Sequence, residues 1–94
     1  MTERFSWSED KSHWLSRERG VTFVDVVVAI RNRRLALIDN PNQDEYRGQC
    51  LFVVEISDYA WAVPASKTAE GWFLHTAYPS RAMTLRYFRK DSRK

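Results

Sequence analysis

Cysteine, histidine and glycine are scarce in this chain of 94 residues, and each scarcity excludes a class of protein. The single cysteine, Cys50, excludes an internal disulfide framework and a cysteine-based zinc site. The two histidines, His13 and His75, are too few for a zinc site of three or four ligands. The three glycines lie far apart, which excludes a glycine-rich phosphate loop. We therefore expect no metal and no cofactor.

Long apolar runs are also missing. No run approaches the roughly 20 residues of a membrane-spanning helix. Residues 1–4 lead into no hydrophobic signal core, and no serine stands in the strand-to-helix turn of a serine hydrolase. These absences predict a cytoplasmic protein with no membrane partner.

Aromatic residues are plentiful, with four Trp, four Tyr and five Phe. Apolar residues make up 44% of the chain and charged residues 29%, which is the balance of a globular protein. Because rings bury large areas, a chain of this length can build a core. We expect a single domain over residues 1–94.

Positive charge is concentrated at the C-terminal end. Residues 81–94 hold six Lys or Arg and one acidic residue, whereas the rest of the chain holds nine basic and eleven acidic residues. A cationic end on a mildly acidic body favours a polyanion or an acidic protein as partner. The alternative is a solvated tail that only aids solubility. We expect the chain to fray from about residue 89.

The first helix is predicted over residues 6–19. Ser6 stands three positions before Glu9, the spacing of a capping box at a helix start. Gly20 follows the last turn, where a left-handed residue ends many helices.

The second segment, residues 22–34, is valine-rich and suits a buried strand by propensity alone. The spacing of Thr22 and Asp25 and the helical spacing of the apolar residues favour a helix instead. A last helix is predicted from about residue 81.

Between these helices the pattern changes to strands and turns. We expect strands over residues 35–39, 50–56, 59–65 and 72–78. The predicted class is α+β, with two N-terminal helices packed on a four-stranded antiparallel sheet and a short C-terminal helix. Nothing in the sequence covers the second sheet face. We expect that face to be aromatic and partly exposed, which suits stacked bases or a protein partner.

Metal-free cleavage of RNA fits what remains after these exclusions. The nucleophile, the 2′-OH, belongs to the substrate, so the protein has to position it, move protons and neutralise charge. His, Tyr and Lys move protons, and Arg grips phosphate. The candidates are His75, Tyr46, Tyr87, Lys67, Arg47 and Arg81. Each also has a purely structural interpretation, as a sheet histidine, a core tyrosine or a solvated cation.

Four segments in chain order resemble the BrnT-like toxins. Residues 5–11 (FSWSEDK) and 19–25 (RGVTFVD) are similar to F-x-W-x-x-x-K followed by R/H-G-[VI]-[ST]-F-E-[DE]. Residues 39–49 (DNPNQDEYRGQ) resemble an H-P-N…R-Y…Q loop, and residues 73–81 (FLHTAYPSR) resemble F-L-K-T-I-I-P-S-R. The resemblance covers nearly the whole chain.

This resemblance implies the toxin of a type II toxin–antitoxin system in the RelE/ParE superfamily, held inactive by an antitoxin protein encoded nearby. It also implies an α-α-β-β-β-β-α order and carries Arg81 over as an active-site cation. Two positions depart from the pattern: His75 replaces Lys, and Asn40 replaces the loop His. His75 can still act as a base, whereas Asn40 cannot move a proton at neutral pH.

Our leading hypothesis is therefore an endoribonuclease that works without metal. Arg81 would grip the scissile phosphate, His75 would act as general base or acid, and Tyr46 would help orient the RNA. The residues expected to bind RNA are Arg47, Lys67, Arg86, Tyr87 and Arg89. The alternatives are a non-catalytic module that binds nucleic acid or protein, and a gyrase-directed toxin on the same scaffold. The sequence indicates neither the RNA preference nor the oligomeric state.

Overall fold

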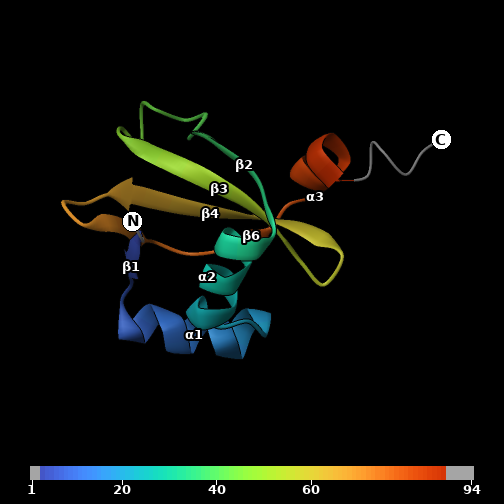
Figure 1. The fold of residues 1–94 in the computed structure, drawn as a ribbon, viewed down its shortest axis with the longest axis horizontal. Coiled ribbons are helices and arrows are strands. Elements are labelled where there is room, and N and C mark those ends of the chain that lie inside the picture. The colour runs from blue at the N-terminus through green and yellow to red at the C-terminus, as the bar shows by residue number, and fades with distance from the viewer. Residues whose placement is uncertain (1–2, 89–94) are drawn as a thin grey trace.

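One curved sheet forms the centre of the molecule, with helices on both of its faces (Figure 1). The computed structural model describes residues 3–88. The elements in chain order are β1 (Arg4–Ser6), α1 (Glu9–Arg19), α2 (Phe23–Asn32), β2 (Arg34–Asp39), β3 (Gln49–Ile56), β4 (Tyr59–Lys67), β5 (Gly71–Leu74), β6 (Tyr78–Pro79) and α3 (Arg81–Met83), which continues as a π-helical turn, η1 (Thr84–Phe88). The α+β class is confirmed. The predicted fraying from residue 89 lies outside the described residues.

The prediction of four antiparallel strands is wrong, because the sheet has six strands and is mixed. Its order is β1-β5-β4-β3-β2, with β6 also paired to β4. The additional edge strand, β1, pairs in parallel with β5, placing Phe5 opposite Trp72. Gly71 permits this close approach, since a Cβ there would collide with the Arg4 backbone.

Because residues 4–6 form β1, the first helix begins later than predicted, at Glu9. Ser6 lies in β1, opposite Phe73, and is therefore not the N-cap. The cap is Ser8, whose side chain accepts a hydrogen bond from the Lys11 backbone amide. The predicted C-cap is confirmed, because Gly20 adopts a left-handed conformation with φ of 74°.

The valine-rich segment forms a helix, as its capping signal predicted. Thr22 Oγ1 accepts a hydrogen bond from the Asp25 amide at 3.1 Å, and the Asp25 carboxylate accepts one from the Thr22 amide at 3.0 Å. The backbone amides of Thr22 and Asp25, at the start of α2, thus both have hydrogen-bond acceptors. The helix ends at Asn32, and Arg34 already belongs to β2.

The aromatic core lies between the sheet and the first two helices. Side chains of α1 and α2 pack there against large residues of the central strands. The buried members include Leu15, Phe23, Val26, Ile30, Phe52, Val54, Trp61, Val63, Trp72 and Leu74. This face therefore supplies most of the buried apolar area.

The second face is partly exposed, as expected, but the central strand contributes no aromatic rings to it. The central strand presents small residues there, Ala60, Ala62 and Pro64, opposite β3. The C-terminal helix covers part of this face, where the buried Thr84 hydroxyl accepts a hydrogen bond from the Ala60 amide at 2.9 Å. The part left open is the groove described below.

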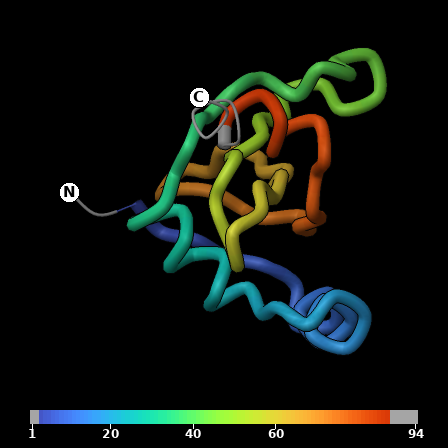
Figure 2. Tube along the Cα trace, turned by 90° about the vertical axis from the view of Figure 1, so that its right-hand side faces the viewer, coloured from blue at the N-terminus to red at the C-terminus, as the bar shows by residue number. Residues whose placement is uncertain are grey.

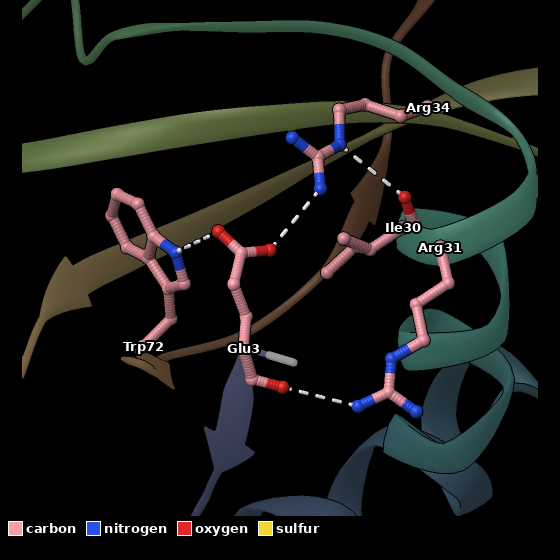
Figure 3. A network of polar contacts seen from close by, with 5 residues as sticks. All are labelled: Glu3, Ile30, Arg31, Arg34 and Trp72. Carbon is pink, nitrogen blue, oxygen red and sulfur yellow. Dashed lines mark hydrogen bonds and ion pairs between the residues drawn. The ribbon is translucent and has the colours of Figure 1, made fainter. Parts of the chain in front are cut away.

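A polar network built on Glu3 joins the N-terminus to three other segments (Figure 3). The Glu3 carboxylate accepts hydrogen bonds from Trp72 Nε1 at 3.2 Å and from Arg34 at 3.3 Å. The Glu3 carbonyl accepts a third from Arg31 at 3.1 Å, and Arg34 Nε also donates to the Ile30 carbonyl. Arg31 of α2 and Arg34 of β2 thus tie Glu3 to the sheet and to the second helix.

Candidate functional site

A proline in a central strand creates the irregularity on which the candidate site is built. The His75 amide donates to the Pro64 carbonyl at 2.9 Å, but Pro64 has no N–H to return the bond. Beyond this point the pairing shifts, and Tyr78 lies opposite Ala62. His75 and Tyr78 are three residues apart, whereas their partners Pro64 and Ala62 are only two apart. The strand with the extra residue therefore contains a β-bulge. For this reason the predicted strand over residues 72–78 is split into β5 and β6.

The bulge changes which side chains share a face. In a regular strand, residues 75 and 78 would point to opposite faces of the sheet. With one extra residue between them, His75 and Tyr78 both face away from α2, whereas Leu74 and Ala77 both lie in the core. The bulge thus brings an imidazole and a phenol to one surface.

That surface is a groove of about 620 Å³. Leu51 of β3 and Pro64 of β4 line it from the sheet, and the loop of residues 40–49 lines one side. The segment from His75 to Tyr78 lines another side, and Lys11 and Met83 complete it. Figure 2 shows α1, in blue, and the green loop after β2 on the same side of the molecule, with the orange segment between them.

His75 is held as a neutral base within this groove. Its Nε2 forms a hydrogen bond of 2.7 Å with the Ser66 hydroxyl. The Phe73 ring packs edge-on against the imidazole, with 5.1 Å between the two ring centroids. Burial lowers the pKa of His75 below its ordinary value of 6.5, so the imidazole is uncharged at neutral pH. Within residues 3–88, Nδ1 has no hydrogen-bond partner. This nitrogen is therefore open to a ligand in the groove.

Asn40 organises the loop beside the groove. It is 9% exposed, and its side-chain oxygen accepts a hydrogen bond from the Asn42 amide at 3.0 Å. Its side-chain nitrogen donates to the Gln49 side chain at 3.4 Å. Asn40 therefore shapes the loop that carries Tyr46, a role that needs no proton transfer.

The structure brings together two of the three predicted catalytic residues. Tyr46 and His75 line the same groove, although 29 positions separate them in the sequence. Arg81 is exposed at the first position of α3 and is not among the groove-lining residues. It lies between Tyr78 and Met83, which do line the groove.

The predicted RNA-binding residues are dispersed. Arg47 is exposed and directly follows Tyr46 in the loop. Lys67 lies on the opposite side of the sheet, with its ammonium 4.8 Å from the Trp72 ring centroid. Arg86 stands over the Tyr87 ring at 5.5 Å, outside the groove lining. Arg89 lies outside the described residues.

Three residues of the site were not predicted from the sequence. Lys11 lines the groove from α1, and Tyr78 lines it from β6. Ser66, which was expected in a loop, lies in β4 and pairs with His75. Pro64 inside an apolar strand was the available signal for a bulge, whereas nothing local to Lys11 indicates its position.

Comparisons with protein-family models, curated proteins and solved structures found no significant match to this chain. In the part of the chain that the structure describes, no helix is long and apolar enough to cross a membrane. Those residues also bring together no group of three or more His, Cys, Asp or Glu side chains that can hold a metal. A functional proposal for this chain therefore rests on the groove and on the sequence resemblance.

Proposed function

We propose that the protein is an endoribonuclease that works without metal, the toxin of a cytoplasmic type II toxin–antitoxin system that inhibits translation. One observation carries the catalytic part. His75 is a neutral imidazole whose Nδ1 has no hydrogen-bond partner among the described residues, and it lines an open groove together with Tyr46. The antitoxin partner rests on the resemblance to BrnT-like toxins.

The proposed chemistry starts from the 2′-OH of the RNA. His75 Nδ1 accepts its proton while the 2′-oxygen attacks the adjacent phosphorus, and the bond from phosphorus to the 5′-oxygen breaks. We assign the proton donated to the departing 5′-oxygen to Tyr46, which lines the same groove. The products are a 2′,3′-cyclic phosphate and a free 5′-hydroxyl.

Ser66 has a positioning role in this scheme. In the tautomer that leaves Nδ1 of His75 free to accept a proton, Nε2 carries the ring hydrogen and donates it to the Ser66 hydroxyl, 2.7 Å away, both before and after the imidazole becomes charged. Arg81, exposed beside the groove-lining Tyr78 and Met83, is the proposed cation for the phosphate.

The test is RNA cleavage by the full chain in EDTA. We expect His75→Ala to lower the cleavage rate by about 100-fold or more, the usual contribution of a general base. We expect Arg81→Ala also to slow cleavage, and an RNA in which every 2′-OH is methylated to stay intact. Arg17→Gln, which removes one exposed charge outside the groove, is the matched control. Cleavage should weaken as salt rises, because phosphate contacts release counterions.

Full activity in both the His75→Ala and Arg81→Ala variants would remove the proposed site. Activity that disappears in EDTA and returns with a divalent metal would contradict the proposed chemistry. Binding of RNA without any product, even at high protein concentration, would favour the non-catalytic module. DNA damage with intact messenger RNA in cells would favour a gyrase-directed toxin.

A further inference from the structure

Two exposed aromatic rings line the groove from different segments. Tyr46, on the loop after β2, is 42% exposed, and Tyr78, on β6, is 37% exposed. The large rings of the central strands, Trp61 and Trp72, are buried. A tyrosine kept at the surface of a groove offers a flat apolar face, and a planar ligand that stacks there removes this face from water.

The charge of the groove has one sign. Lys11 lines the groove, and its ammonium lies 4.0 Å from the centroid of the Trp14 ring. The Arg19 guanidinium carbon lies 4.7 Å from the centroid of the same ring. Arg19 is anchored by a hydrogen bond of 2.7 Å to the Ala77 carbonyl, so α1 is fixed beside the bulge. No Asp or Glu is among the described residues that line the groove. This environment suits an anion.

We propose that the groove holds one nucleotide of a single-stranded RNA. Its base packs on the rings of Tyr46 and Tyr78, and its phosphate lies near the Lys11 ammonium. A duplex is excluded as the ligand because paired bases are stacked on one another and present no free face. This inference rests on the proposed function and specifies the form of its substrate.

The ring contacts are tested by binding rather than by cleavage. The probe is a single-stranded hexanucleotide of 2′-O-methyl RNA, which has no free 2′-OH and therefore survives contact with a ribonuclease. Fluorescence anisotropy with the full chain gives its Kd. We expect Tyr46→Ala and Tyr78→Ala each to raise Kd about tenfold, since base stacking on a ring has that strength. Tyr46→Phe and Tyr78→Phe keep the rings and should stay within about twofold of wild type.

The phosphate contact is tested by salt. For single-stranded nucleic acid, each phosphate contact contributes about 0.7 to the slope of log K against log salt. Lys11→Gln should reduce the slope by about that amount, whereas the tyrosine variants should leave it unchanged. Arg17→Gln removes a charge from the same helix but outside the groove, and should also leave the slope unchanged. Circular dichroism confirms that each variant is folded.

Wild-type affinity in both tyrosine-to-alanine variants would overturn the proposal, as would equal affinity for a duplex of the same length. Cleavage that depends on His75 but not on either ring would overturn this site and the acid role of Tyr46, while a ribonuclease with His75 as its base remains. Binding that depends on the rings, with no cleavage of natural RNA, would support the site and overturn the proposed function.

Discussion

The two faces of the sheet are built from different kinds of residue. On the face toward α1 and α2, Phe52, Trp61 and Trp72 fill the space between the layers. On the other face, Ala62, Pro64 and Ser66 follow one another at alternate positions of β4. Large rings on one face supply buried area, and small side chains on the other leave room for a groove. The comparison separates the residues that stabilise the fold from those available to a ligand.

Polar groups divide in the same way. The Glu3 carboxylate, Trp72 Nε1 and the Arg34 guanidinium satisfy one another in the network of Figure 3. In the groove, by contrast, His75 Nδ1 has no partner within residues 3–88, and Lys11 forms no ion pair there. Arg31 and Arg34 are therefore committed to contacts within the fold, whereas the groove retains binding capacity.

The largest contrast should appear in stability. We expect Phe52→Ala to lower the free energy of unfolding by about 3–5 kcal/mol, because it deletes a fully buried ring. Tyr78→Ala should cost less, about 1 kcal/mol, since that residue is 37% exposed and its removal opens no cavity in the core. Urea denaturation followed by circular dichroism measures both. Similar losses for the two variants would show that the faces do not differ as described.

A smaller effect is expected within the Glu3 network. Glu3→Ala leaves the half-buried Trp72 N–H without its acceptor and should cost about 1–2 kcal/mol of unfolding free energy. Glu70→Ala is the matched control. Its ion pair with Arg4 is 3.8 Å long between side chains that are 75% and 78% exposed, and contributes little. Equal losses, measured by urea denaturation, would mean that the network does not stabilise the fold.

The smallest effect is the pH dependence contributed by His75. Because burial lowers the pKa of His75 in the folded protein, the unfolded chain binds the proton first as pH falls. Wild type should therefore lose stability relative to His75→Gln as pH falls from 7.5 through 6.5 and on to the folded pKa. Comparing the two proteins cancels the titration of the other groups. Parallel curves would contradict a partly buried imidazole with a lowered pKa.

Local signals were enough to predict several elements of the fold. The reciprocal Thr22 and Asp25 bonds settle α2 as a helix despite its valines. The turn at Ser57 and Asp58, both with positive φ, closes the hairpin of β3 and β4. In these places a few neighbouring residues determine the conformation, so a single sequence carries the information.

The missed features depend on contacts between distant segments. β1 is three residues long and is defined by its pairing with β5, a strand more than 60 residues later in the chain. The groove combines Lys11, Tyr46 and His75, which no spacing rule connects. The exception is Pro64, whose missing N–H was visible in the sequence and causes the bulge that brings Tyr78 to the same face as His75.

The most direct test of the central claim, that the small-residue face is the RNA site, is to map binding by NMR. The 2′-O-methyl hexanucleotide would be titrated into isotope-labelled protein, and amide and ring shifts followed on both faces. We expect the shifts to concentrate at Lys11, Tyr46, His75 and Tyr78 and to spare Val24 and Val28 on the exposed side of α2. Shifts confined to α2, with His75 and Tyr78 unmoved, would contradict it.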